Sequence, residues 1–436
     1  MLIKIKNNSI LVIAFFLVIS LFITGCAAQR NLKGESKTQV QPSKPIPKTP
    51  EKTISPKPSI ISKAPLTLVA PEDIPPLLDD LDKDSLLAAI ENSLLFYSRV
   101  NAETRYPMGT EYYTAGELKE TLLAFQEIVK KCESDECTKK SIMAAFDFYK
   151  AAGRDQQGTV LFTGYFEPII QGSLERNDAY PFPVYRPPEE TVVVHLDRFN
   201  KKYEGETVTG RLFNGEIVPH YSREDIDGKG VLKGRNLEIA WAADSIELFF
   251  LHIQGSGIME LPDGRKIRIG YARSNGRPFR GLAGILLEQG KITEKEISHE
   301  AVKTYLQDHP EERRELMHKN PSYVFFRILD GENVGSHNVP LTAGRTIATD
   351  PKYFPKGALA FIKLRMPVFS EDGNGVNWTP ISRFVLNQDA GGAIKGTGRV
   401  DLFCGTGVDA ERVAGSIREE GALYFLLKKK TSPALK

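Results

Sequence analysis

The stretch that decides the fold, residues 382–407, reads S-R-F-V-L-N-Q-D-A-G-G-A-I-K-G-T-G-R-V-D-L-F-C-G-T-G. Two apolar runs, at 384–386 and 400–403, predict short buried strands. The connection between them is rich in glycine, which lets the backbone approach another strand or a ligand closely. Asp389 follows the first run, and Asp401 lies within the second.

These two aspartates are the first candidates for chemistry. A carboxylate inside an apolar strand is costly to bury as an ion, so we expect the pKa of Asp401 to rise. A carboxylic acid that stays protonated near neutral pH can act as a general acid. The same two residues could instead cap turns, and this stretch alone leaves both interpretations open.

The first 26 residues form a separate segment. Lys4 and Lys6 precede an apolar run at 11–22 that is too short for a comfortable membrane span. The segment ends in I-T-G-C, which resembles a bacterial lipobox, so we expect a signal peptide over 1–26 and a lipid anchor on Cys26. An ordinary signal peptide is the alternative. Ala27 after the cysteine favours, by resemblance to sorting rules, the periplasmic side of the outer membrane.

Residues 27–76 are expected to form a linker. Prolines alternate with lysines and serines, a composition that favours an extended chain without a core. At about 3 Å per residue, such a tether reaches on the order of 100 Å. The whole chain of 436 residues has a net charge of only +2, which gives no sign of a nucleic-acid partner.

The chain has four cysteines. Cys132 and Cys137 lie in a charged stretch and are expected to form a disulfide at the turn between two helices, since no histidine is near enough in sequence to suggest a metal site. Cys404 is expected to be a small buried side chain. The seven histidines are scattered and no metal-binding motif is present, so we expect neither a metal nor a cofactor.

The remaining pattern predicts a mainly β protein with peripheral helices. Apolar residues at helical spacing predict helices over 85–98, 116–130 and 139–150, and later over 282–289, 294–307, 311–318 and 410–420. Short apolar runs between turn signals predict a small β-domain from about 169 to 269, including a strand over 246–253.

Three further motifs carry polar groups that suit ligand binding. Gln254-Gly255-Ser256-Gly257 could hydrogen-bond a sugar or a peptide, or form a plain turn. The segment Y-A-R-S-N-G-R-P-F at 271–279 suits stacking on sugar rings and pairing with carboxylates, although an exposed turn would look similar. Asp350 is most simply a turn former.

Together these segments resemble the membrane-bound lytic murein transglycosylase A family, in the family's order, over roughly residues 155–430. The matching blocks are G-Y-F-E-P at 164, Y-P-F-P-V-Y at 180, Q-G-S-G at 254, Y-A-R-S-N-G-R-P-F at 271, N-P-S-Y-V-F-F at 320, V-P-L-T-A-G-R-T-I-A-T-D at 339 and Q-D-A-G-G-A-I-K-G-T-G-R-V-D at 388. Arg273 departs from an expected glycine, and Cys404 from an expected polar or aromatic residue.

The resemblance implies a double-psi β-barrel assembled from 77–168 and 270–436, a smaller β-domain inserted at 169–269, and a groove between them for a glycan strand of peptidoglycan. It assigns the catalytic acid and base to Asp401, a tuning role to Asp389 and a structural role to Asp350. The residues it places against the substrate are Tyr165, Gln254, Gly255, Ser256, Gly257, Tyr271, Asn275 and Lys395.

The implied activity is that of a peptidoglycan lytic exotransglycosylase. Protonated Asp401 would donate to the oxygen between N-acetylmuramic acid and N-acetylglucosamine, and its carboxylate would then activate the muramic C6 hydroxyl to close a 1,6-anhydro ring. The alternatives are a hydrolase that uses Asp389 to activate water, and a non-catalytic lipoprotein that binds peptidoglycan. Cell-wall synthesis or scaffold proteins are possible partners.

Overall fold

The computed structural model describes residues 64–430, apart from 109–110, 204–205, 332–333 and 371–374. The expected signal peptide, Cys26 and the linker up to residue 63 therefore lie outside the described residues. Within those residues, no helix is both long enough and apolar enough to cross a membrane.

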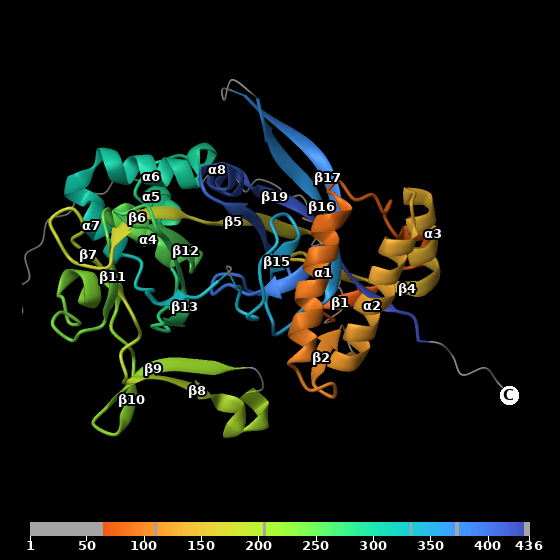
Figure 1. Cartoon of the computed structure of the whole chain (residues 1–436), viewed down its shortest axis with the longest axis horizontal. Helices are drawn as coiled ribbons and strands as arrows, with labels where there is room; N and C mark the ends of the chain where they lie inside the picture. The colour runs from red at the N-terminus through yellow and green to blue at the C-terminus, as the bar shows by residue number, and fades with distance from the viewer. Residues whose placement is uncertain (1–63, 109–110, 204–205, 332–333, 371–374, 431–436) are drawn as a thin grey trace, which may run out of the picture. The chain divides into compact units, whose positions relative to one another are not determined.

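Six strands from the described residues close into a β-barrel (Figure 1). Around the ring each strand pairs with the next, and β19 closes it by pairing with β5. The pairs β5–β18 and β15–β17 are parallel, and the others are antiparallel. In ring order the strands are β5 (Val160–Glu167), β18 (Arg399–Thr406), β15 (Thr346–Ala348), β17 (Val376–Asp389), β16 (Leu359–Phe369) and β19 (Arg418–Lys428).

Alternating side chains fill the barrel, as strand geometry requires. Phe162, Val400, Leu402 and Phe425 are fully buried in its core. Two further strands, β4 (Phe146–Ala151) and β1 (Leu66–Leu68), extend the sheet beyond β19. The expected mainly β barrel fold is confirmed.

Three helices, α1 (Lys83–Ser98), α2 (Ala115–Lys131) and α3 (Asp135–Ala145), belong to the barrel part of the chain. Thr114 and Glu117 form a capping box that fixes the start of α2. Arg345, completely buried, holds the segment before α1 by donating to Asp79 Oδ2 at 2.7 Å and to the carbonyl oxygen of Phe384 at 2.9 Å. A hairpin of β2 (Arg105–Met108) and β3 (Glu111–Thr114) precedes α2.

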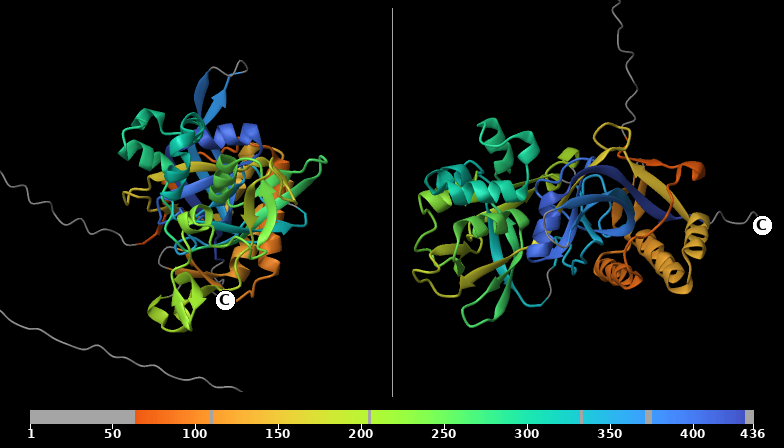
Figure 2. Two further views of the ribbon diagram at one scale, coloured as in Figure 1. Left: turned by 90° about the vertical axis from the view of Figure 1, so that its left-hand side faces the viewer. Right: turned by 90° about the horizontal axis from the view of Figure 1, so that it is seen from above.

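A second sheet follows β5 in the chain. Four helices accompany it, α4 (Ser245–Gln254), α5 (Leu282–Glu288), α6 (His299–Asp308) and α7 (Pro310–His318), and they share one apolar core. Seen from above in Figure 2, the blue C-terminal strands lie between this green segment and the orange helices. In sheet order the strands are β14 (Val324–Leu329), β13 (Lys266–Ser274), β12 (Gly257–Glu260), β6 (Ile169–Ser173), β11 (Glu238–Ala242) and β7 (Phe182–Tyr185).

A small three-stranded sheet branches from the same segment. It consists of β8 (Thr191–His195), β9 (Thr207–Phe213) and β10 (Glu216–Val218). On the barrel side, the helix α8 (Val408–Ser416) connects β18 to β19 and packs against β5.

Two expected boundaries differ from the structure. The expected end of the inserted domain at residue 269 falls inside β13, and β13 pairs with β14, so the second sheet and its helices continue to Leu329. The linker expected to reach residue 76 ends earlier, because Leu66 is buried and β1 pairs with β4.

Three expected elements are also corrected. The run 246–253 is the helix α4 rather than a strand, capped by the side chain of Asp244. The helix expected over 139–150 ends at Ala145, because the alternating Phe146 and Phe148 enter the core as β4. The helix expected over 410–420 ends at Ser416, because the chain from Arg418 to Gly421 pairs with β5 as the start of β19.

Candidate active site

The parallel pair β5–β18 carries the candidate active site on its outward face. Thr163 of β5 lies opposite Asp401 of β18, and Tyr165 lies opposite Phe403. Because side chains alternate along a strand, the neighbours Val400 and Leu402 point into the barrel while Asp401 points outward. The alternation along this strand thus explains why its single carboxyl lies on the outward face, where it is half-buried.

Asp401 is held by a short polar chain. Arg399 Nη2 donates to Thr163 Oγ1 at 3.2 Å. A guanidinium can only donate, so the Thr163 hydroxyl is free to donate its own proton to Asp401 Oδ1. Burial raises the pKa of the Asp401 carboxyl, and the hydrogen bond from Thr163 and the charge of Arg399 oppose part of that rise.

Asp389 lies at the end of β17, and both of its carboxylate oxygens accept hydrogen bonds. Tyr165 Oη donates to Asp389 Oδ2 at 2.9 Å, while the backbone N–H groups of Ser336 and Ala390 donate to Oδ1 at 2.7 and 2.8 Å. Burial and the neighbouring Asp389 raise the pKa of the Tyr165 hydroxyl well above its ordinary value, so it remains a donor. Tyr165 therefore links Asp389 of β17 to β5, the strand that pairs with the Asp401 strand β18.

Asp350 anchors the glycine-rich connection between β17 and β18. Its Oδ2 accepts from the backbone N–H of Gly396 at 2.8 Å, and its Oδ1 accepts from that of Lys352 at 3.1 Å. The side chain is buried, with both oxygens facing backbone donors. This geometry favours the structural role that the resemblance implies.

The Q-G-S-G motif lies at the C-terminal end of α4, and not at a strand end as expected. Gln254 closes the helix, and its Oε1 accepts from the backbone N–H of Phe166 on β5 at 3.2 Å. Gly255 ends the helix in the left-handed region at φ 82°, which glycine adopts without strain. Ser256 follows half-buried, and Gly257 begins β12.

Two other expected substrate contacts, Tyr271 and Lys395, are exposed side chains, on β13 and in the glycine-rich connection respectively. The expectation for Asn275 is wrong. Its side chain is completely buried, and its Nδ2 donates to the carbonyl oxygens of Tyr221 and Pro321 at 2.9 and 2.8 Å. Asn275 thus holds neighbouring segments together and has no free group for a ligand.

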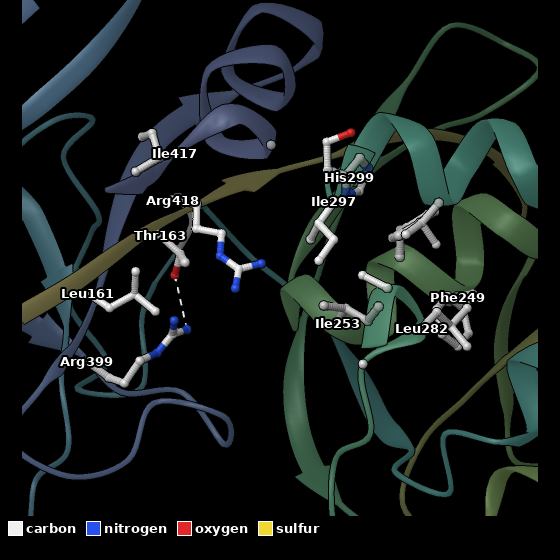
Figure 3. Close-up of a pocket in the computed structure, with 16 residues that line it drawn as sticks. Leu161, Thr163, Phe249, Ile253, Leu282, Ile297, His299, Arg399, Ile417 and Arg418 are labelled. Atoms are coloured by element: carbon white, nitrogen blue, oxygen red, sulfur yellow. Dashed lines mark hydrogen bonds between the residues drawn. The ribbon is translucent and has the colours of Figure 1, made fainter. Parts of the chain in front are cut away.

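A cavity of about 430 Å³ lies beside the Thr163–Asp401 pair, between the barrel and the helices of the second sheet (Figure 3). Thr163, Arg399 and Arg418 line it from the barrel. Apolar side chains of the second part, among them Ile253 and Ile297, line the opposite wall. The volume falls within the range of small-molecule sites.

Sequence reasoning missed several residues of this site. Thr163 and Arg399 were not singled out, although each lies two positions before a chosen residue and therefore on the same strand face. Outside the cavity lining, Glu167 at the end of β5 was not predicted either. It is buried, accepts from Thr406 Oγ1 at 2.8 Å, and has its pKa raised by that burial.

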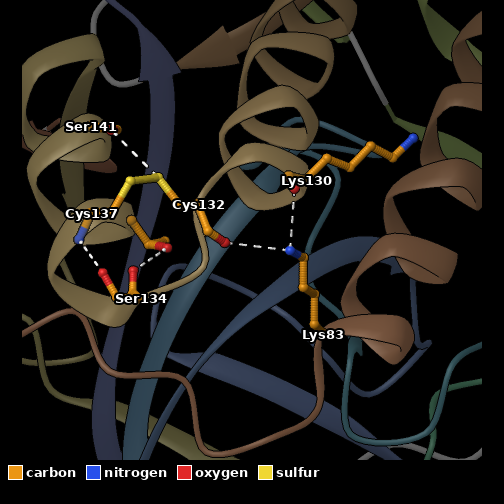
Figure 4. Close-up of a disulfide and its surroundings, with 7 residues drawn as sticks. Lys83, Lys130, Cys132, Ser134, Cys137 and Ser141 are labelled. Atoms are coloured by element: carbon orange, nitrogen blue, oxygen red, sulfur yellow. Dashed lines mark hydrogen bonds between the residues drawn. A yellow bond between two sulfur atoms is a disulfide. The ribbon is translucent and has the colours of Figure 1, made fainter.

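Of the three cysteines among the described residues, Cys132 directly follows α2, Cys137 lies in α3 and Cys404 lies on β18. Cys132 and Cys137 form a disulfide between α2 and α3, as expected, with their Cα atoms 5.5 Å apart (Figure 4). The carbonyl oxygens of Lys130 and Cys132 both accept from Lys83 Nζ at 3.4 Å, which ties this corner to the start of α1. Cys404 is a half-buried thiol whose pKa burial raises to about 12, so it is a poor nucleophile.

Comparison with known protein families matches two adjoining regions of the chain. The MltA specific insert domain matches residues 161–327, and the 3D domain matches residues 345–427. The first region contains the second sheet, apart from the last two residues of β14, and its helices; the second contains all three aspartates together with most of the barrel. Fold and site thus define a two-part barrel protein with an acidic site facing the inserted part.

Individual relatives agree. Membrane-bound lytic murein transglycosylase A of Escherichia coli K12 is 29% identical over 290 residues, which cover 66% of this chain and 70% of the relative. The crystal structure of membrane-bound lytic murein transglycosylase from Agrobacterium tumefaciens is 30% identical, covers 83% of this chain and 97% of that one, and superimposes with a TM-score of 0.68. The crystal structure of MltA from Neisseria gonorrhoeae is 25% identical, covers 85% of this chain and 93% of that one, and superimposes with a TM-score of 0.61. The chain belongs to the membrane-bound lytic murein transglycosylase A family.

Proposed function

We propose that this protein is a peptidoglycan lytic transglycosylase that cleaves the bond between N-acetylmuramic acid and N-acetylglucosamine and leaves a 1,6-anhydro end. The observation that carries the proposal is the state of Asp401. One of its oxygens is held by Thr163, and burial raises the pKa of the carboxyl. A carboxyl fixed at one oxygen keeps the other for proton transfer.

The reaction then needs one catalytic side chain. Protonated Asp401 donates its proton to the glycosidic oxygen as the bond to the muramic C1 breaks. The Asp401 carboxylate next takes the proton of the muramic C6 hydroxyl, whose oxygen bonds to C1 and closes the anhydro ring. The proton balance closes, because Asp401 ends the cycle protonated, and no water is consumed.

The surroundings of Asp389 favour this route over hydrolysis. Hydrolysis with inversion or retention uses a second carboxylate, as a base for water or as a nucleophile. Both oxygens of Asp389 already accept hydrogen bonds from Tyr165 and two backbone groups. We assign Asp389 to orientation of the site, and Asp350 to support of the connecting loop.

For substrate contacts we retain Tyr165, Gln254, Gly255, Ser256, Gly257, Tyr271 and Lys395. The contact of Gln254 with the backbone of Phe166 places its side-chain amide next to Tyr165. The groove between the barrel and the inserted domain would hold the glycan strand. We place the domain division at the exit from β5 and the end of β14.

We further propose that Cys26 carries a lipid anchor that attaches the protein to the membrane, with the outer membrane facing the periplasm as its location. The lipobox-like sequence and the proline-rich stretch after it support this proposal. Metabolic labelling with a palmitate analogue, compared between the full chain and Cys26→Ala, tests it; label on the Cys26→Ala protein would contradict it. Cell-wall synthesis proteins remain candidate partners.

Mass spectrometry of soluble products tests the activity. The purified full chain is incubated with peptidoglycan, and an anhydro-forming reaction gives products lighter by one water than hydrolytic muropeptides. Products of full hydrolytic mass would assign the protein to the hydrolases. A folded protein that binds peptidoglycan and releases nothing would be a binding protein.

A further inference from the structure

The barrel wall of the cavity in Figure 3 carries two arginines beside Leu161 and Ile417, and the opposite wall is mainly apolar. Arg399 and Arg418 project from the barrel, and Ile253, Leu282 and Ile297 face them from the inserted part. Mixed walls of this kind suit a ligand that carries both a carboxylate and small alkyl groups.

The two arginines are available to a ligand. Within the part of the chain that the structure describes, neither has a carboxylate oxygen within 4 Å; Arg399 donates only to the Thr163 hydroxyl. The acidic neighbours of Arg418 along β19 bind elsewhere: Glu419 to Arg365 at 2.8 Å, and Glu420 to Arg154. The barrel wall therefore keeps uncompensated positive charge.

Other basic groups nearby behave differently. His299 Nε2 lies 3.1 Å from Glu411 Oε1, and Lys303 Nζ lies within 3.1 Å of Glu411 and 2.9 Å of Glu247. Histidine and lysine at this junction are thus balanced by carboxylates, and only the arginines face the cavity without one among the described residues. The contrast leaves the two arginine side chains able to pair with an external anion.

The chemistry of the substrate restricts what that anion is. This step rests on the proposed function. Of the two sugars in a glycan strand, only N-acetylmuramic acid carries a lactyl arm, which ends in a carboxylate or continues into a peptide bearing carboxylates and methyl groups. Thr163 contacts both Arg399 and Asp401, so the cavity adjoins the reacting sugar.

We propose that Arg399 and Arg418 form a subsite for a carboxylate on the muramic side arm, with Ile253, Leu282 and Ile297 contacting its alkyl groups. Filling this subsite also affects the acid. Arg399 lowers the pKa of Asp401, and a bound carboxylate would offset that charge, so an occupied subsite keeps Asp401 protonated to higher pH.

Binding measurements test the subsite apart from catalysis. Asp401→Asn of the full chain, which should not turn over, serves as the background for Arg418→Gln, Arg418→Lys and Arg399→Gln. Arg105→Gln is the matched control, since Arg105 is an exposed arginine of β2 on the barrel part. Three probes are compared: a hexamer of N-acetylglucosamine without carboxylates, amidase-treated strands with free lactyl carboxylates, and peptide-bearing strands.

We expect Arg418→Gln and Arg399→Gln each to weaken binding of a carboxylate-bearing probe about ten-fold, whereas Arg418→Lys loses less and Arg105→Gln loses nothing. Loss confined to amidase-treated strands identifies the lactyl carboxylate, and loss confined to peptide-bearing strands identifies the peptide. Equal loss for the uncharged hexamer would overturn the proposal, as would unchanged binding of all three probes.

The two proposals fail in distinguishable ways. If the wild-type chain forms anhydro products and the arginine variants bind every probe normally, only the subsite is wrong. If the wild-type chain forms no anhydro products, the proposed function fails whatever the binding results.

Discussion

At the scale of single residues, the site depends on two hydrogen bonds that link three side chains in a fixed order. Arg399 donates to Thr163, and Thr163 in turn donates to Asp401. This order fixes the hydroxyl rotor and stabilises the carboxylate form of Asp401, while burial stabilises its protonated form. An acid that must also serve as a base benefits from such opposed influences, because neither protonation state becomes inaccessible.

Replacing Asp401 by asparagine should remove nearly all turnover. General acid–base catalysis contributes about 10²–10⁴-fold, so we expect at least a loss of that size in the release of anhydro products. Unfolding by guanidinium, measured by circular dichroism, should match that of the wild type. An Asp401→Asn protein that keeps near-normal turnover would rule out Asp401 as the catalytic residue.

Replacing Thr163 by valine should change the pH dependence. The Thr163 hydroxyl donates to the carboxylate and so lowers the pKa of Asp401; without it, that pKa rises further. The acid form then persists to higher pH, and the alkaline limb of kcat/KM moves upward by roughly one pH unit. Thr163→Ser keeps the donor and should retain the wild-type limb. A downward shift in Thr163→Val would contradict this order of donation.

The sequence predicts a site residue when its neighbours in the chain mark it, and fails when its role depends on strand pairing or tertiary packing. Asp401 is accessible to prediction, because a carboxyl in an apolar strand is physically unusual. Thr163 is not, since its role depends on which strand pairs with β18. Asn275 illustrates the opposite error: its neighbours resemble a binding loop, and only tertiary packing reveals that it is buried.

At the scale of elements, one buried arginine joins the first described segment to the barrel. Arg345 lies just before β15, and besides Asp79 and Phe384 it donates to the carbonyl oxygen of Asp82 at 2.8 Å and to Ser85 Oγ at 3.1 Å. Asp82 is the N-cap of α1, so the start of that helix and two barrel strands meet at a single guanidinium.

Replacing Arg345 by methionine should therefore destabilise the protein. Removing one partner of a buried, hydrogen-bonded ion pair costs about 3–5 kcal/mol. The measurement is the free energy of unfolding from a denaturant titration. Arg365→Gln is the matched control: the Arg365 side chain is exposed, so losing its pair with Glu419 should destabilise the protein far less than the loss of the buried Arg345. Equal effects of the two changes would contradict the anchoring role.

The sequence predicts a helix or a strand correctly where only one face of that element is buried, because the apolar residues then recur at a regular spacing. The stripes of α1 and α2 gave helices close to the observed bounds, with α2 at Ala115–Lys131 against an expected 116–130. The run 246–253 failed because most of α4 is buried, which leaves no periodicity to separate helix from strand. Helices α5 to α7 were expected correctly as helices, but local pattern carries no information on which core they cover.

At the scale of the whole molecule, the inserted part contacts the barrel through a few polar links. Gln254 reaches the backbone of β5, and Glu411 of α8 binds His299 and Lys303 of α6. The bond with His299 is the main cause of a lowered pKa of Glu411. A lowered pKa means that the link stabilises the fold above the ordinary glutamate pKa and is lost as pH falls through the lowered value.

Replacing Glu411 by glutamine should loosen α6 from α8 already at neutral pH. We expect hydrogen exchange of α6 to rise in Glu411→Gln at pH 7. In the wild type it should rise only as the pH falls below the ordinary glutamate pKa of 4.5. Hydrogen–deuterium exchange mass spectrometry, at pH 7 and at a pH below 4.5, measures the exchange of α6 in both proteins. Exchange of α2, whose disulfide-linked corner lies on the barrel part, is the internal control. Unchanged exchange of α6 in the variant would contradict the link.

The chain leaves the barrel at Pro168 and returns after β14, so both ends of the inserted part join the barrel. The inserted part can therefore be exchanged as one unit, a cassette. The arginines of the cavity belong to the barrel, and the mainly apolar wall opposite them belongs to the cassette. A chimaera that exchanges the cassette between relatives would therefore separate two preferences. The chimaera would keep the charge selectivity of the protein that supplies the barrel, and would take the selectivity for the size of the side arm from the protein that supplies the cassette.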